Sequence, residues 1–249
     1  KNKVLSLPDG VDQLVIGGFS GMSIVAAVGR PYGTFYSIDL LKDNQGRQVI
    51  DSVTGAPKST TSPNYLGSFQ PKFIASWGTN LTYKGFTFNV LFDTKQGGYF
   101  FSRTKDIMEF VGTSASSTLN NREPFVWDNS VYENSDGDFV PNTDIKTDVY
   151  NYFTAANVKP ASQDLVKAGY IKLRELAIGY KLPQKWFSNT FIGSGNFSIF
   201  GNNLFIWTNE GNDFVDPEVN SGGASNEQGF DFSARPSIRN YGFRLGLTF

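Results

Sequence analysis

The sequence contains no cysteine and no histidine among its 249 residues. Thiol nucleophiles, disulfide frameworks, zinc fingers and histidine-based catalytic triads are therefore excluded for this chain. A metal site would need oxygen ligands of the kind that calcium and magnesium prefer. Charge is scarce and balanced, with 22 Lys and Arg against 23 Asp and Glu. The net charge of −1 offers no basic surface for nucleic acid and no polybasic patch for a membrane.

Long apolar runs are also missing, because no stretch reaches the roughly 18 apolar residues of a membrane-spanning helix. Residues 1–6 lack the apolar core of a signal peptide and the sequence does not begin with Met, which favours a mature chain or a piece of a longer protein. Aromatic residues are abundant, with 23 Phe, 11 Tyr and 4 Trp, and there are 26 Gly. This composition is typical of a β-rich protein with many turns.

Alternating apolar and polar residues predict an antiparallel hairpin at 73–93. Residues 73–83 are long enough for a tilted strand to cross a bilayer, which takes roughly 9–11 residues. Lys84 and Gly85 then form a two-residue turn into a second alternating strand. The period of two assigns one face to lipid and the other to the interior. The predicted lipid-facing residues are Trp77, Phe86, Phe88, Val90, Phe92, Ile178 and Tyr180, and the predicted interior residues are Ser76, Asn80, Asn89 and Asp93.

Further strands are predicted at 170–182, 196–208 and 241–249. In the first of these, Lys172 and Arg174 share the parity of the apolar side, and we expect them to stand above the bilayer. A sixth strand is expected within 23–41, with a bend or bulge at Arg30 and Pro31.

The connections between these strands alternate in length. Those at 42–70, 102–166 and 209–236 are long, whereas those at 84–85 and 183–195 are short. Long loops on one rim and short turns on the other are typical of outer-membrane barrels. The expected fold class is therefore all-β: a portion of an antiparallel transmembrane β-barrel with long extracellular loops.

Candidates for chemistry are few. Residues 134–138 (NSDGD) resemble part of a calcium loop but lack its terminal Glu, so an ordinary acidic turn is favoured over a calcium site. The sequence has no G-x-S-x-G nucleophile motif, and neither enzyme activity nor a cofactor is expected. Four aromatic residues of the 102–166 connection are candidates for stacking on a substrate: Trp127, Tyr132, Tyr150 and Tyr152. Alternatively, they pack the loop on the barrel rim or contribute to an interfacial girdle.

Several segments, in order along the chain, resemble SusC/RagA-type TonB-dependent outer-membrane proteins. They are 28–36 (VGRPYGTFY), 83–86 (YKGF), 91–93 (LFD), 97–98 (GG), 170–183 (YIKLRELAIGYKLP), 201–208 (GNNLFIWT), 216–218 (DPE) and 241–249 (YGFRLGLTF). Each motif is weak alone, and the set is specific.

The resemblance implies a large barrel, of about 22 strands, around an N-terminal plug domain. Residues 1–249 would then be the C-terminal part of the barrel, without the plug and the earlier strands. It also implies import of oligosaccharides or peptides across the outer membrane of Gram-negative bacteria. The implied partners are a SusD-like surface lipoprotein and the TonB complex, the latter contacting the N-terminal part that this sequence lacks.

The closing aromatic residues resemble the signal that the barrel-insertion machinery reads. Tyr241, Phe243 and Phe249 are the residues predicted to carry it. Two other functions remain open from the sequence. A soluble or surface β-rich carbohydrate-binding module would explain the aromatic residues but not the alternating loop lengths, and a passive porin would share the barrel.

Overall fold

The computed structural model describes residues 2–155, 158–213 and 215–249. Contacts divide the chain into two compact units. The first, here called the sheet unit, comprises Pro71–Gly97, Ala168–Pro217 and Arg235–Phe249. The second, here called the loop unit, comprises Lys1–Gln70, Gly98–Lys167 and Glu218–Ala234. Among the described residues, no helix is long and apolar enough to cross a membrane.

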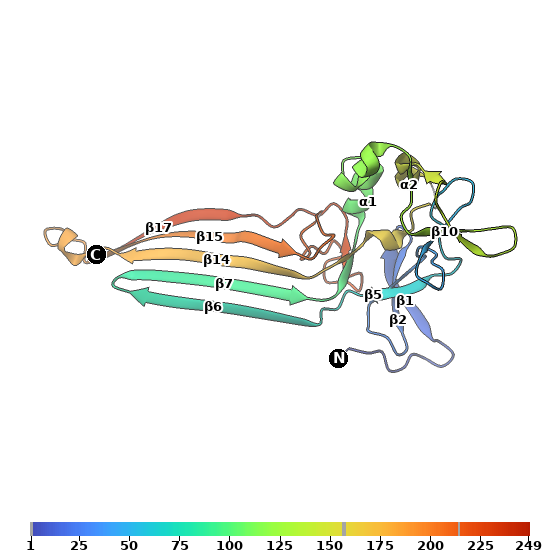
Figure 1. The fold of residues 1–249 in the computed structure, drawn as a ribbon. Coiled ribbons are helices and arrows are strands. Elements are labelled where there is room, and N and C mark those ends of the chain that lie inside the picture. The colour runs from blue at the N-terminus through green and yellow to red at the C-terminus, as the bar shows by residue number, and fades with distance from the viewer. Residues whose placement is uncertain (1, 156–157, 214) are drawn as a thin grey trace. The chain divides into compact units, whose positions relative to one another are not determined.

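The sheet unit is one antiparallel sheet of five long strands in the order β17-β15-β14-β7-β6 (Figure 1). The strands are β6 (Phe73–Tyr83), β7 (Phe86–Gln96), β14 (Tyr170–Lys181), β15 (Ser194–Thr208) and β17 (Asn240–Thr248). A short 3₁₀ turn, η3 (Gln184–Trp186), lies in the connection from β14 to β15. All five strands were predicted from the alternation of apolar and polar residues, and the structure confirms them.

The tight hairpin between β6 and β7 is also confirmed. Tyr83 pairs directly with Phe86, so only Lys84 and Gly85 lie in the turn. Both turn residues have positive φ, 46° and 86°, as the two-residue turns that match strand twist require. Gly85 adopts this conformation without strain because it has no Cβ.

Strand register gives the sheet one apolar and one polar face. Trp77 pairs with Phe92 on the apolar face, and Ile178 lies between Phe88 and Ile199. On the other face, Ser76 pairs with Asp93 and Asn80 with Asn89, which also share a side-chain hydrogen bond. The predicted division of residues between two faces is therefore correct. That the apolar face meets lipid stays a prediction.

A β-bulge at Arg174 corrects the interpretation of the charged start of β14. The register shifts between Leu173 and Glu175, so the parity of the strand changes there. Lys172 consequently pairs with Asp93 on the polar face, and Leu173 pairs with Phe92 on the apolar face. The extra residue removes Lys172 from the apolar side, and the expected position of these residues above the bilayer stays a prediction.

The loop unit contains four small sheets in place of the expected sixth long strand. Segment 23–41 forms two short antiparallel strands, β2 (Met22–Ala27) and β3 (Thr34–Ser37), with Arg30 and Pro31 in the turn between them. The single-strand prediction was wrong because this turn reverses the chain where a bend was expected. β1 (Gln13–Phe19) and β5 (Asn64–Ser68) complete the sheet in the order β1-β2-β3-β5.

The connections expected to be loops carry most of the remaining elements. They hold β4 (Gln48–Ile50), α1 (Arg103–Phe110), η1 (Ala115–Arg122), β9 (Phe125–Val126), β10 (Ser130–Glu133), β11 (Phe139–Pro141), β12 (Lys146–Thr147), α2 (Val149–Thr154), η2 (Ala161–Asp164), β13 (Leu165–Lys167), which ends one residue past its connection, and β16 (Phe230–Asp231). β8 (Tyr99–Ser102) lies just before the 102–166 connection and ends at its first residue. The three further sheets have the orders β11-β10-β4, β12-β9 and β13-β8-β16.

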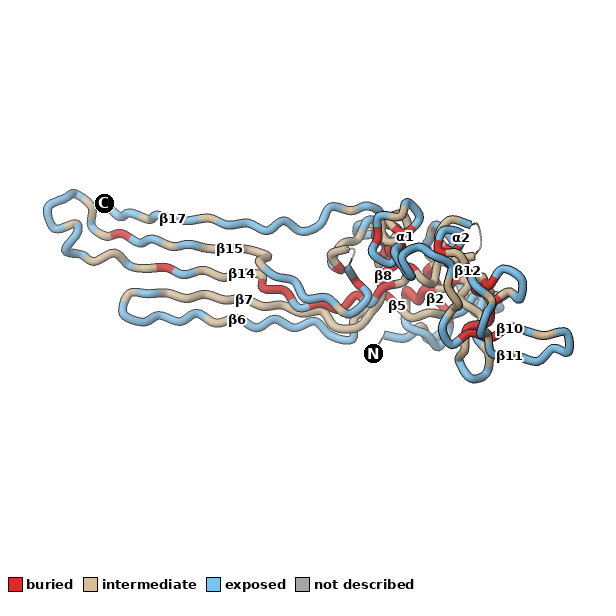
Figure 2. The backbone as a smooth tube through the Cα atoms, turned by 45° about the horizontal axis from the view of Figure 1, so that its top comes forward, coloured by how far each residue is buried: buried red, intermediate tan, exposed pale blue. Residues whose placement is uncertain are grey.

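An aromatic-rich core holds the loop unit together. Phe35, Phe101 and Phe230 are buried in one cluster, and Phe101 and Phe230 pack edge to face at 5.7 Å between ring centroids. Because Phe230 lies in β16, the core joins segments that are far apart in sequence. Figure 2 shows the contrast in burial, with buried residues gathered in the loop unit and the long strands mainly exposed or half-buried.

Candidate functional site

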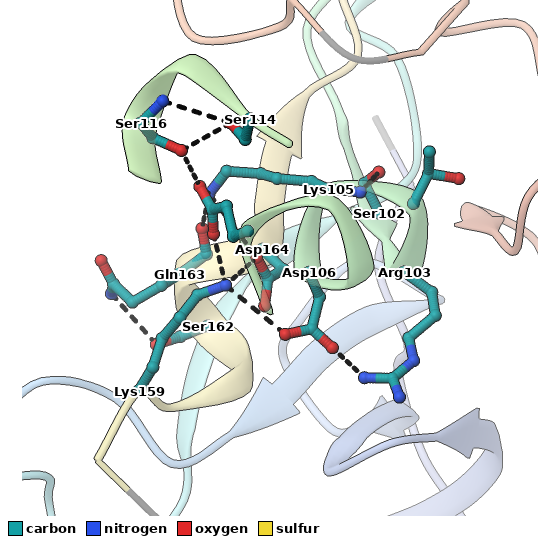
Figure 3. Close-up of polar contacts among 12 residues, drawn as sticks. Ser102, Arg103, Lys105, Asp106, Ser114, Ser116, Lys159, Ser162, Gln163 and Asp164 are labelled. Atoms are coloured by element: carbon teal, nitrogen blue, oxygen red, sulfur yellow. Dashed lines mark hydrogen bonds and ion pairs between the residues drawn. The ribbon is translucent and has the colours of Figure 1, made fainter. Parts of the chain in front are cut away.

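A cluster of ion pairs around Lys159 joins the helical parts of the loop unit (Figure 3). The Lys159 Nζ atom lies 2.5 Å from Glu109 Oε2 and 2.6 Å from Asp164 Oδ1. Asp106 Oδ1 lies 3.5 Å from the same nitrogen. Asp106 and Glu109 belong to α1 and Asp164 to η2, so one ammonium group ties two elements together.

The cluster is almost closed to solvent. The side chains of Glu109 and Asp164 are each 3% exposed and that of Lys159 is 6% exposed. Burial raises the pKa of Asp164 above its ordinary value, while the charges of Lys159 and Lys105 act in the opposite direction. The Ser116 hydroxyl donates to Glu109 Oε1 at 2.7 Å, which adds η1 to the cluster. Lys105 Nζ lies 3.6 Å from both Glu109 Oε1 and Asp164 Oδ1, so removing Lys159 would leave these two buried carboxylates with one more distant cation.

A cavity of about 350 Å³ lies beside this cluster. Phe101, Ile107, Phe110 and Phe153 form its apolar walls, and its charged lining includes Arg103, Asp106, Lys159 and Asp164. Arg103 pairs with Asp106, and Lys159 with the carboxylates described above. The cavity therefore offers aromatic surface and internally neutralised charge.

The four predicted substrate-stacking residues do not form a single site. Trp127 and Tyr152 lie together, with ring centroids 5.0 Å apart, and Tyr152 is buried in α2. Burial and the nearby carboxylates of Glu109 and Asp164 raise the pKa of the Tyr152 phenol. Trp127 and Tyr152 thus pack against each other within the loop unit, and their contact with a substrate stays a prediction.

Tyr150 and Tyr132 lie elsewhere. Tyr150 is 72% exposed on α2, and it borders a second hollow of about 210 Å³ that is also lined by Phe110, Phe153 and Arg122. Tyr132 is half-buried in β10. Of the four, Tyr150 is the residue most accessible to a ligand.

The acidic segment 134–138 is the tip of the hairpin between β10 and β11. The Asn134 side chain accepts hydrogen bonds from the backbone N–H groups of Asp136 and Asp138, at 3.0 and 2.8 Å. This arrangement is an Asx-type turn. Within the described ranges, no group of three acidic side chains is placed to hold a metal ion.

A second polar cluster, which the sequence analysis did not anticipate, lies at the bulge of the sheet unit. Arg174, the bulge residue, pairs with Asp93 on β7 through contacts of 2.7 and 2.9 Å. It also donates to Asn203 Oδ1 on β15 at 3.2 Å. Asn203 has a positive φ of 53°, so β15 is irregular at the same level as the bulge of β14.

Lys172 forms the other half of this cluster. Its side chain is 1% exposed and its Nζ atom lies 2.8 and 2.7 Å from the two carboxylate oxygens of Asp216. The Ser237 hydroxyl donates to Asp216 Oδ2. Three of the sequence motifs thus meet in space: LFD through Asp93, KLR through Lys172 and Arg174, and DPE through Asp216. One feature of the sequence could have indicated this cluster: Lys172 and Arg174 are charged residues at positions where the alternation of the strand calls for apolar ones.

The predicted assembly residues lie along the edge strand β17 and just beyond it. Tyr241 and Phe243 are 71% and 75% exposed, and Phe243 stacks on Phe197 of β15. Phe249 is 76% exposed and stacks on Phe191, with ring centroids 5.5 Å apart. Their role in assembly stays a prediction.

Comparisons with known proteins give consistent results. No family model matches the sequence. The whole chain is 23% identical over 277 aligned residues to TonB-dependent receptor P3 of Formosa agariphila, and it spans 26% of that protein. The fold matches the RagAB peptide transporter with a TM-score of 0.68 and 18% identity, and the open-open state of the RagAB peptide importer with a TM-score of 0.65 and 17% identity.

Each of these structural matches covers 99% of the chain and 25% of the solved chain. The present chain therefore spans about a quarter of the length of its relatives. Its five long strands correspond to part of a barrel, and its motifs occur in family order. The fold, the motifs and the sequence match over the whole of this chain together support its similarity to part of the outer-membrane β-barrel of SusC/RagA-type TonB-dependent receptors.

Proposed function

We propose that this chain supplies wall and extracellular loops to an importer that takes up short peptides or oligosaccharides through the outer membrane. The two-faced sheet carries the proposal. A strand whose side chains alternate between apolar and polar can meet lipid on one side and water on the other. The polar face, which carries Asn89, Glu175 and Arg244, borders a hollow of about 650 Å³ suited to the wall of an aqueous lumen.

Peptides are the favoured substrate class. The solved structures with this fold are described as a peptide importer and a peptide transporter. The family resemblance adds a SusD-like surface lipoprotein as lid and the TonB complex as energy source. In this proposal the chain contributes the barrel portion, with the plug and earlier strands supplied by the rest of the parent protein.

We place substrate contact on the 102–166 connection, at the extracellular mouth. Tyr150 is the leading candidate because it is exposed beside an aromatic hollow with Arg122 nearby. Tyr132 is a further contact candidate, and Trp127 and Tyr152 support the loop from within. Binding loops on a rigid scaffold commonly carry such contacts.

Uptake by cells that carry the full-length parent protein tests the proposal. Labelled short peptides and oligosaccharides are offered to cells with and without the parent gene, each with active and inactivated TonB. We expect uptake of peptides that requires both the gene and TonB. Uptake that needs the gene but not TonB would support the passive porin instead, and uptake of neither class would contradict the importer.

A further inference from the structure

The buried cluster at the bulge joins two chain segments that lie on opposite sides of a long excursion. The chain leaves the sheet after Thr208 at the end of β15 and re-enters it at Asn240, where β17 begins. Asp216 lies on the outgoing arm and Ser237 on the returning arm, and both contact the Lys172 ammonium group. Between them, Glu218–Ala234 belongs to the loop unit.

Lys172 is the residue that both arms contact, and its own strand holds it in place. It lies on β14, which is hydrogen-bonded on both sides, to β7 and to β15. Its ammonium group contacts both oxygens of Asp216, and Asp216 accepts the Ser237 hydroxyl. An independent contact holds the returning arm, because the Asn203 amide donates to the Ile238 carbonyl at 3.2 Å.

The placement of the junction follows from the bulge. Because Lys172 pairs with Asp93, its side chain belongs to the polar face of the sheet. Without the extra residue at 174, strict alternation would turn Lys172 to the apolar face and away from Asp216. A buried ion pair persists only where its geometry and hydrogen bonds offset desolvation, and this pair has two close oxygens and a hydroxyl donor.

We propose that Lys172, Asp216 and Ser237 form a clasp that holds the two arms of the 209–239 excursion together on the polar face of the sheet. The clasp closes the excursion at its base. It acts as a positioning device for the two arms themselves, residues 209–217 and 235–239, which both belong to the sheet unit. This inference does not depend on what the protein transports.

Distance measurement between the two arms tests the clasp in the full-length parent protein. Spin labels are attached to cysteines introduced at Asp213 and Arg235, which are both exposed and flank the junction. The unaltered clasp should give one narrow distance distribution by pulsed electron paramagnetic resonance. Lys172→Met and Asp216→Asn each break the pair, and we expect loss of the narrow distance in both. Lys181→Met, an exposed lysine on the same strand, is the matched control and should leave the distance unchanged.

Two additional variants separate the clasp from general damage to the barrel. The double variant Lys172→Met/Asp216→Asn should give a distance distribution no broader than that of either single variant, because each single change removes the same interaction. If the single variants do not assemble, Ser237→Ala removes one hydrogen bond without burying a lone charge, and it should broaden the distribution less. An unchanged narrow distance in Lys172→Met or Ser237→Ala would overturn the clasp, as would a double variant clearly broader than both single variants. Uptake is not the readout, so failure of this inference is distinguishable from failure of the proposed import function.

Discussion

Individual charged side chains inside the loop unit contribute strongly to its stability because they are buried. Replacing Lys159 by Met removes the nearer of the two cations that face Glu109 and Asp164, and leaves only Lys105, 3.6 Å away. Loss of one partner of a buried pair typically costs about 3–5 kcal/mol. We therefore expect faster amide hydrogen exchange in α1 and η2 of the parent protein. Lys167→Met, an exposed lysine on β13, is the control and should have little effect. Equal exchange in the two variants would contradict a stabilising role of the cluster.

The raised pKa of Asp164 predicts how local stability depends on pH. A carboxyl whose pKa is higher in the folded state binds its proton more tightly there than in the unfolded chain. Its contribution to stability is therefore full below the ordinary value of 3.8 and is lost as pH rises through the raised pKa. The facing groups are Glu109 of α1, Tyr152 of α2, and the cations Lys105 and Lys159.

Asp164→Asn should remove this dependence. We expect the exchange rate of η2 amides, corrected for intrinsic chemistry, to rise less between pH 4 and 7 in the variant than in the parent protein. Asp144→Asn changes an exposed acid in the same connection and serves as control. A pH profile of Asp164→Asn that coincides with the parent would refute the assignment.

Among the elements, the bulge in β14 determines which side chains share a face. Deleting Arg174 restores an uninterrupted period of two, so either Lys172 turns to the apolar face or Leu173 turns to the polar one. We expect loss of folded barrel from the outer membrane in this variant. Arg174→Ala keeps the extra residue and loses only the contacts to Asp93 and Asn203, so its yield should fall less. Heat-modifiability on gels measures the folded fraction. Equal yields would show that register is set elsewhere.

How far the sequence predicts these elements depends on the physical signal each one leaves. The long strands were predicted well because one apolar residue at every second position leaves a clear period over 11 residues in β6. The hairpin at Lys84 and Gly85 was equally clear. β2 and β3 were merged because strands of six and four residues are too short for a reliable period. The clasp was missed because its partners, Lys172 and Asp216, meet only through a bulge and a distant loop.

The candidate site shows the same limit. Aromatic content indicated that the 102–166 connection could contact a substrate, but it did not show that Tyr150 is exposed whereas Tyr152 is buried. The two residues are two positions apart on α2, and one is exposed while the other is buried. Helical spacing would have made this distinction, yet a helix of six residues carries too few positions to be recognised in a polar segment.

For the molecule as a whole, the central expectation is that the two faces of the sheet meet different solvents. Phe88 and Asn89 are neighbours on β7 that belong to opposite faces. Spin labels at these positions in the parent protein should report lipid at residue 88 and water at residue 89, measured by accessibility to oxygen and to a polar relaxation agent. Equally aqueous environments at both positions would exclude the barrel wall.

Assembly of the complete barrel gives the last prediction. In the bilayer every strand edge must be paired, because unsatisfied backbone groups are costly in lipid. Among the described strands β17 is hydrogen-bonded to β15 alone, so its other edge must find a partner within the full barrel. Tyr241, Phe243 and Phe249 lie on the apolar parity of this segment and resemble a signal for barrel insertion. A girdle role would also account for exposed aromatic residues at this place, so the test must separate insertion from transport.

The variant Phe249→Asp in the full-length parent protein distinguishes an effect on insertion from an effect on transport. If Phe249 is read during insertion, outer-membrane yield should fall while uptake per surviving molecule stays normal. Phe191→Asp is the matched control, because it changes the stacking partner of Phe249 without altering the β17 segment. A fall in yield confined to Phe249→Asp assigns the effect to the insertion signal, and equal losses in both variants assign it to the aromatic stack. Unchanged yield in Phe249→Asp would refute an assembly role, since a charge at a position that the machinery reads cannot be silent.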